Sequence, residues 1–204
     1  MSDPKSLGYG DNKMVKREQP QSLVPTGEEW AMWKEVAATL LTGGFAPPCF
    51  KCPEQLLAAF LTGREMGIGP MEAKDNLTPM NGRMAPSSAL QLSQAYKRLP
   101  EFQCEVLEST AQVCKIRARR SPRDVWQVDE WTIKEAARVT QPNGKALTEK
   151  DNWRNYPKDM LYNRCLGRLL AKICPDTTGP TRYAKEIVQD FGPEVTQPKQ
   201  LTTN

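Results

Sequence analysis

Residues 153–175 read WRNYPKDMLYNRCLGRLLAKICP, and much of the expected fold follows from them. Their apolar positions recur every three or four residues from Tyr156 to Ile173, which predicts one long helix that Pro175 ends. One face of this helix is apolar and carries Tyr162, Leu166, Leu169, Leu170 and Ile173. The opposite face is basic, because four-residue spacing places Arg164, Arg168 and Lys172 within one quadrant. Such a helix is expected to pack one side into a core and to present the other to solvent.

The remaining chain alternates between helical and strand-like patterns. We expect three earlier helices: one from the N-cap Thr26 to Gly43-Gly44, one after Pro53, and one over residues 88–96. Residues 76–84 contain Asn81-Gly82, which is typical of a hairpin turn. Residues 102–107 and 113–118 alternate polar and apolar and predict two antiparallel strands. A short helix at 131–139, a loop at 140–152 and a turn or two at 185–191 complete the expected elements. The order predicts an α+β fold, in which a small antiparallel β-sheet and a hairpin pack against helices.

The composition indicates one domain between polar ends. Residues 1–28 and 193–204 hold Pro, Gly, Ser and Gln with few large apolar residues, so we expect flexible tails around a core at 29–192. No apolar run approaches the ~20 residues needed to cross a bilayer. The first residues have no apolar segment like that of a signal peptide. We therefore expect a cytoplasmic protein without a membrane partner.

Several kinds of chemistry are disfavoured by what the sequence lacks. There is no histidine, which removes Ser-His-Asp and Cys-His catalysis and the commonest metal ligand. Cys49 and Cys52 form a CxxC, but no second CxxC is present to complete a zinc site, so we expect reduced, mostly buried thiols. No phosphate-binding loop of the GxxxxGK[ST] type is found, which argues against ATP use. We expect no cofactor, and at most a divalent cation that modulates DNA binding.

Positive charge is concentrated in two clusters, although the net charge is only +4 and the pI about 8.7. The first cluster is Lys115, Arg117, Arg119, Arg120 and Arg123; the second is Arg154, Lys158, Arg164, Arg168 and Lys172. Alternation along a strand would place the first three on one face. Rows of cations suit a phosphate backbone. The alternative for each cluster is an ordinary solvated surface, and edge strands often carry cations to deter aggregation.

Aromatic residues accompany both clusters. Trp126 and Trp131 follow the first cluster, Trp153 and Tyr156 precede the last helix, and Tyr183 stands next to Arg182 after it. Single-strand-binding proteins combine cations with flat side chains that stack on bases, at ~1–3 kcal/mol per base. We expect Trp153, in its polar context, to stack on bases. Core packing is the favoured role for Trp30, Trp33 and Trp131.

Four ordered segments resemble the RecT family of phage-type recombinases. Residues 61–73, LTGREMGIGPMEA, are similar to the family's GREMGIxPMxA segment, and residues 81–87, NGRMAPS, to its INGKPxLS segment. Residues 131–136, WTIKEA, resemble its W-T-x-x-x-A helix. Residues 153–161, WRNYPKDML, with Arg164, Arg168 and Cys174-Pro175-Asp176, resemble its most specific motif, W-x-x-Y-P-x-x-M-L-x-x-R. The resemblance spans about residues 30–191.

The resemblance implies an ATP-independent protein that binds single-stranded DNA and anneals it to a complementary strand, without a bond-breaking active site. The implied partners are single-stranded DNA, the annealed duplex, and further copies of the chain in a ring or helical filament. A partner exonuclease or a host single-strand-binding protein is a further candidate, although the match does not include the C-terminal region tied to such partners in longer members. Motif positions imply DNA contacts for Arg83, Lys158, Arg164 and Arg168 and place Met160 near the bases or in the core, whereas Arg64 could instead pair with a carboxylate. Where this chain has Tyr162, family members often have a basic residue.

Two alternatives remain open from the residues. A metal-dependent nuclease would need several carboxylates that converge on paired ions, and no recognisable motif provides them. A non-catalytic adaptor of the same fold would coat DNA or bind a protein, and its DNA interaction would be weak and insensitive to salt.

Overall fold

The structure is a computed structural model that describes residues 22–80, 82–141 and 143–177. Several predictions lie outside these residues: residues 1–21 of the tail predicted at 1–28, the turn at 185–191, the tail at 193–204, and the DNA contact of Arg182. The predicted tail extends too far, because Gly27 and Glu28 already belong to the first helix. Within the described ranges, no helix combines the length and apolar character that a membrane span requires.

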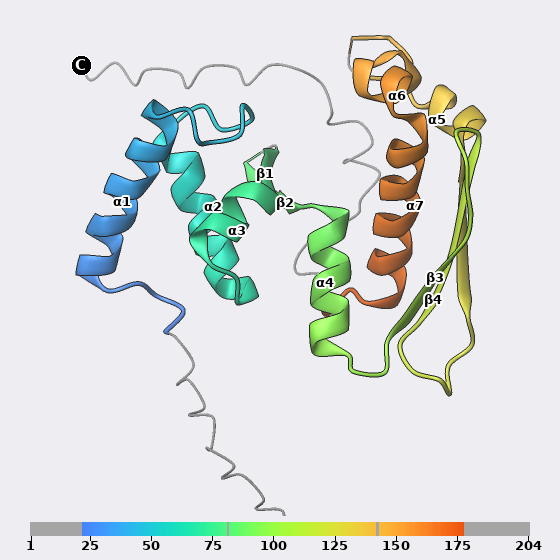
Figure 1. The fold of residues 1–204 in the computed structure, drawn as a ribbon, viewed down its shortest axis with the longest axis horizontal. Helices are drawn as coiled ribbons and strands as arrows, with labels where there is room; N and C mark the ends of the chain where they lie inside the picture. The colour runs from blue at the N-terminus through green and yellow to red at the C-terminus, as the bar shows by residue number, and fades with distance from the viewer. Residues whose placement is uncertain (1–21, 81, 142, 178–204) are drawn as a thin grey trace, which may run out of the picture.

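The described elements are arranged as an α+β fold, which confirms the expected class. Two antiparallel sheets are present: the hairpin β1–β2, and a three-stranded sheet in the order β3-β4-β5 (Figure 1). In chain order the elements are α1 (Gly27–Thr42), α2 (Pro53–Met66), α3 (Pro70–Asn76), β1 (Leu77–Met80), β2 (Arg83–Pro86), α4 (Ser88–Arg98), β3 (Gln103–Ser109), β4 (Val113–Arg119), β5 (Gln127–Thr132), α5 (Ile133–Arg138), the short 3-10 helix η1 (Leu147–Glu149), α6 (Asp151–Asn155) and α7 (Pro157–Ile173).

The N-terminal half is a small helical unit that supports the hairpin. Thr26 caps α1 as predicted, in a reciprocal capping box with Glu29. Glu29 also binds Arg64 of α2 at 3.2 Å, so the predicted carboxylate partner of Arg64 is confirmed. The interior of this half is formed by Trp33, Phe50, Leu56, Leu57, Phe60, Ile68, Ala73, Leu77 and Leu90. Because Leu77 belongs to β1, the hairpin is anchored to the same core.

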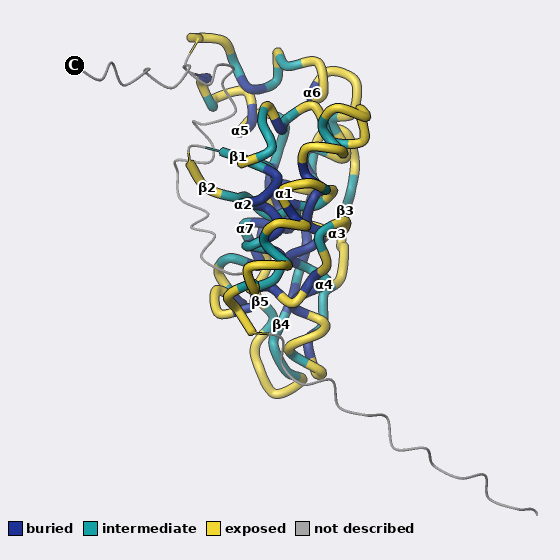
Figure 2. The backbone as a smooth tube through the Cα atoms, turned by 90° about the vertical axis from the view of Figure 1, so that its left-hand side faces the viewer, coloured by how far each residue is buried: buried dark blue, intermediate teal, exposed yellow. Residues whose placement is uncertain are grey.

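The C-terminal half is built around α7, which lies between α4 and the three-stranded sheet (Figure 1). Alternation along β4 turns Cys114, Ile116 and Ala118 inward, as predicted for the last two, and all three are fully buried. The α7 residues in this core are Leu161, Cys165, Leu166, Leu169 and Leu170. The buried backbone accordingly runs through the middle of the molecule, with exposed stretches outside it (Figure 2).

Helix α4 joins the two halves. Its N-terminal residue Leu90 belongs to the core under the hairpin, and Ala95, further along, belongs to the core around α7. Ser87 caps α4 and also donates a hydrogen bond to Asn76 at the end of α3. The hairpin, α4 and α7 are therefore held in a defined arrangement.

Three elements differ from the prediction. Residues 127–132 form the strand β5, so Trp131 lies in a strand and not in the predicted helix, which begins later, at Ile133. The strand was missed because its buried positions are Asp129 and Trp131, and a carboxylate at an inward position hides the usual alternation. Helix α3 was not expected between Pro70 and Asn76. The predicted loop at 140–152 also contains η1 and the start of α6.

Substitution of Gly63 tests how closely α2 packs on α3. A Cβ at this position would lie 2.6 Å from the Cβ of Ala73, so Gly63→Ala would force two packed helices apart. We expect a net decrease of about 1–2 kcal/mol in the free energy of unfolding, after the gain in helix propensity is subtracted. Urea denaturation would measure it. Gly27→Ala is the matched control, since a Cβ there meets nothing within 4 Å. Equal stability of the two variants would contradict the close approach.

Candidate nucleic-acid interface

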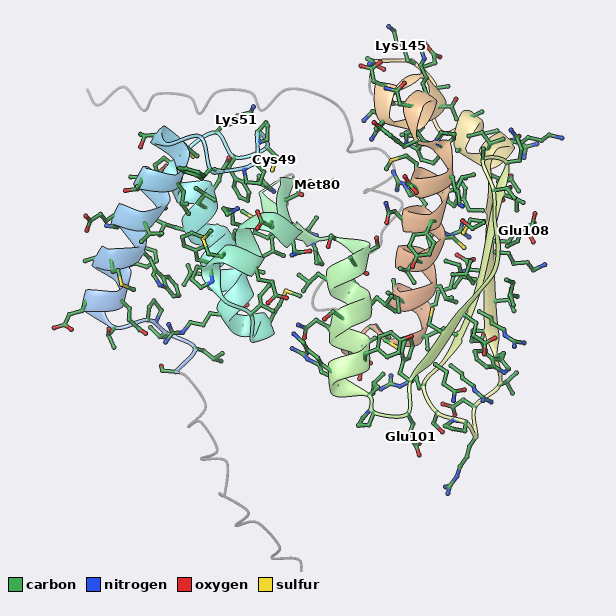
Figure 3. All side chains as sticks on the ribbon, viewed as in Figure 1. Cys49, Lys51, Met80, Glu101, Glu108 and Lys145 are labelled. Carbon is green, nitrogen blue, oxygen red and sulfur yellow. The ribbon has the colours of Figure 1, made fainter. Side chains whose placement is uncertain are left out.

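The first basic cluster lies on the outer face of the sheet, as predicted, but acidic residues share that face. Lys115 binds Glu130 of β5 at 3.1 Å, and Arg117 binds Glu105 of β3 at 2.6 Å. Glu108 stands opposite Lys115 in the β3–β4 register and lies on the side of the sheet away from α7 (Figure 3). The row of cations is thus neutralised by its neighbours, which weakens it as a phosphate-binding surface.

The other members of this cluster also have intramolecular partners. The guanidinium groups of Arg117 and Arg119 each lie 4.4 Å from the centre of the Trp126 ring. Arg119 donates to Gln103 and to the Pro122 carbonyl, and Arg120 forms a bidentate pair with Asp176. Arg123 is exposed in the loop between β4 and β5. These contacts hold the loop between β4 and β5 in place. They also leave few positive charges of the first cluster available to DNA.

In the second cluster, Arg168 and Lys172 converge on one buried carboxylate. Oδ1 of Asp129 accepts hydrogen bonds from Arg168 at 3.0 Å and from Lys172 at 2.9 Å, and Asp129 is only 5% exposed. Arg168 also lies over the Trp131 ring, 4.6 Å from its centre. Their predicted role as DNA contacts remains a prediction, but the structure assigns both cations a role in holding α7 on β5.

Two predictions about exposure, one in α7 and one in α6, are wrong. Arg164 was expected on a solvated basic face, yet it is 6% exposed, because α7 is covered on several sides by α4, the sheet and α6. Trp153 was expected to stack on bases from a polar context, yet it is 4% exposed and belongs to the core around α7. The predicted core positions of Trp33 and Trp131 are confirmed, and Trp30 is half-buried.

A cleft of about 330 Å³ lies between the hairpin, the start of α4, and α6 and α7. This volume is at the lower end of the ~300–1,000 Å³ typical of ligand sites. Met80, which is labelled in Figure 3, lies in the wall that the hairpin contributes to the cleft. The walls are formed by Thr78, Met80, Ala85, Pro86, Ser87, Ser88, Ala89, Gln91, Lys150, Asn152, Trp153, Met160, Asn163 and Arg164. Segments up to 86 residues apart in the sequence thus meet at one site.

The cleft is electropositive. Lys150 and Arg164 contribute to its walls, and no acidic side chain is among the described residues that line it. The pKa of Lys150 is lowered from its usual value, chiefly by burial and then by the positive charge of Arg164. Two cations that repel each other across a partly apolar cleft favour the binding of an anion between them.

Apolar and amide groups complete the cleft. Met80, Pro86 and Met160 provide apolar surface, so Met160, which the resemblance placed near bases or in the core, lies half-buried at the cleft. Ser88 donates to the side-chain oxygen of Asn163 at 2.6 Å, which joins α4 to α7 across the cleft. A site with apolar walls, amides and two cations can hold a flat heterocycle beside a phosphate.

Four predicted residues lie close in sequence to residues that line the cleft. Arg83 faces Met80 across the hairpin, and Arg154, Tyr156 and Lys158 follow one another at the junction of α6 and α7. All four are exposed, and Tyr156 is 62% exposed. Tyr156 thus has an exposed aromatic ring, whereas the ring of Trp153 is buried.

The sequence reasoning missed Lys150. It lies in a stretch assigned to a loop, away from both clusters and outside the quoted motifs. One signal could have identified it: Lys150 is the N-cap residue of α6, three residues before Trp153. This position holds its backbone near the last helix.

Outside the cleft, the described residues give little support for a metal site or for a reactive cysteine. In the described ranges, no three His, Cys, Asp or Glu side chains gather as a metal site would need. No disulfide is formed among the six cysteines. Burial raises the pKa of Cys104 to about 11 and that of Cys165 to about 12, so both are protonated thiols at neutral pH. Cys165 donates to the Asp129 carbonyl and acts as a packing residue.

Comparison with known proteins gives no assignment: no protein-family model matches the chain, and a search of curated proteins finds no match.

The pair of cations on Asp129 yields a stability prediction. Asp129→Asn should decrease the free energy of unfolding by about 1–3 kcal/mol, since it removes the charge that holds Arg168 and Lys172 while both cations can still reach water. Glu101→Gln removes one negative charge from an exposed position and should change stability by less than about 0.5 kcal/mol. Chemical denaturation of the two variants would decide, and coincident unfolding curves would contradict the role of Asp129.

Proposed function

We propose that this protein binds single-stranded DNA and anneals it to a complementary strand without ATP, as the RecT proteins that its motifs resemble do. The observation that supports this most is the electropositive cleft. It brings together the hairpin segment and the last helix, which carry two of the four resembling motifs, and Lys150 and Arg164 give it a charge suited to phosphate.

The walls of the cleft favour a single strand over a duplex. Apolar surface at Met80, Pro86 and Met160 is of use to a ligand only if its bases are accessible, and bases in a duplex are stacked and paired. Exposed Tyr156, three residues after the cleft residue Trp153, adds a surface on which a base could stack. Exposed Arg83 on the hairpin, and Arg154 and Lys158 on α6 and α7, would add positive charge for the phosphates of the bound strand.

We further propose that the protein works as a homo-oligomer in the cytoplasm of a bacterial or phage-infected cell. One cleft of this size holds very few nucleotides, and pairing requires many consecutive bases to be displayed together. Several copies side by side would align their clefts along one strand. Exposed Val106 and Leu107 on the edge strand β3 offer apolar surface for contacts between copies.

The salt dependence of DNA binding tests the cleft. Log K for a single strand should fall linearly with log salt concentration, by ~0.7 for each phosphate neutralised. The double variant Lys150→Gln, Lys158→Gln should bind more weakly and decrease the magnitude of the slope by about 1.4. Fluorescence anisotropy with a labelled oligonucleotide at several salt concentrations measures both quantities.

Lys97→Gln is the matched control, because Lys97 is exposed near the C-terminal end of α4, away from the cleft. It should keep the wild-type slope. A double variant that keeps wild-type slope and affinity would show that the DNA lies elsewhere.

A further inference from the structure

Lys150 is held rigidly at the wall of the cleft. Its amide donates to the Leu147 carbonyl at 3.2 Å, and its own carbonyl accepts from Trp153 and Arg154, both at 3.0 Å. These bonds fix its backbone between η1 and α6. The side chain is half-buried and lines the cleft on the side of α6.

The surroundings of Lys150 are those that turn a lysine into a nucleophile. An amine attacks only in its neutral form, and apolar surroundings or a neighbouring cation favour that form of a lysine. Both influences act on Lys150, because Trp153 and Met160 line the same cleft and the positive charge of Arg164, which also lines it, disfavours a second positive charge. The lowered pKa of Lys150 agrees with this arrangement.

The size and charge of the cleft are compatible with an aldehyde that is carried next to a phosphate. Arg164 would hold a phosphate while Lys150 attacks, and a deoxyribose that has lost its base is small enough to enter between the hairpin and α7. Such a sugar is in equilibrium with an open-chain aldehyde. Single-stranded DNA with an abasic site therefore presents an aldehyde next to the phosphates that the cleft attracts.

We propose that Lys150 captures the aldehyde of an abasic site in single-stranded DNA as a Schiff base. This inference rests on the proposed DNA binding and adds a covalent step at the same cleft. The ammonium group of Lys150 first releases a proton to solvent. Its nitrogen then adds to C1′ of the open sugar, and the amine proton moves to the oxygen to give a carbinolamine. Loss of water forms the C=N bond. No oxidant or reductant is consumed, and water reverses the reaction.

Reductive trapping tests the proposal on the full chain. A labelled oligonucleotide with one abasic site is incubated with the protein and sodium cyanoborohydride, which reduces the C=N bond to a stable amine. The covalent adduct is quantified on a denaturing gel, per mole of DNA bound at saturating protein, and its position is mapped by peptide mass spectrometry. We expect the adduct on Lys150, and Lys150→Arg should decrease its yield at least ~10-fold.

Two controls separate the possible failures. Lys97→Arg, remote from the cleft, should trap as the wild type does. Binding of an undamaged oligonucleotide is measured in parallel, so absence of DNA binding identifies a failure of the proposed function. In that case a small phosphorylated aldehyde replaces the DNA as the trapping probe, and an adduct mapped to Lys150 would still establish the reactive amine. Adducts on other lysines, or an undiminished yield with Lys150→Arg under saturated binding, would overturn the proposal.

Discussion

The packing of α7 between α4 and the inner face of the three-stranded sheet is the contact on which the other features depend. It buries Leu166, Leu169 and Leu170 against Ile116 and Ala118 of β4. It also brings a buried carboxylate, Asp129, against the side of α7, where Arg168 and Lys172 neutralise it. Because α4 packs on the opposite side of α7 and on the core of the first three helices, the hairpin is placed opposite the N-terminal part of α7.

This packing divides the basic residues into two functional groups. Cations on the sheet and on the C-terminal part of α7 meet carboxylates of the same chain, and they stabilise the fold. Lys150 and Arg164 both line a cleft in whose walls no described acidic residue is found. A modest net charge of +4 is therefore compatible with an electropositive site, because carboxylates such as Glu105, Asp129 and Glu130 pair with cations elsewhere.

The sequence was sufficient for elements with strong periodicity and clear end signals. The long last helix, the capped first helix and the turn at Gly82 with a φ of 73° follow from local rules that tertiary contacts do not override. Strand β5 could not be predicted from local rules. Its inward-facing Asp129 is explained only by Arg168 and Lys172 on α7, which is distant in the sequence. The burial of Arg164 and Trp153 was missed for a related reason. A helical projection assigns one apolar face, whereas α7 contacts neighbours on several sides. Lys150 becomes part of a site only when the hairpin and α6 meet in space.

Annealing itself is the direct measurement of the proposed function. Two complementary labelled oligonucleotides are added one after the other to the purified protein, without ATP, and duplex formation is followed by energy transfer. If the cleft binds single strands with their bases accessible, pairing should be much faster than in the protein-free reaction and should weaken as salt is raised. Strands that stay bound to the protein but pair no faster than they do alone would contradict an annealing function.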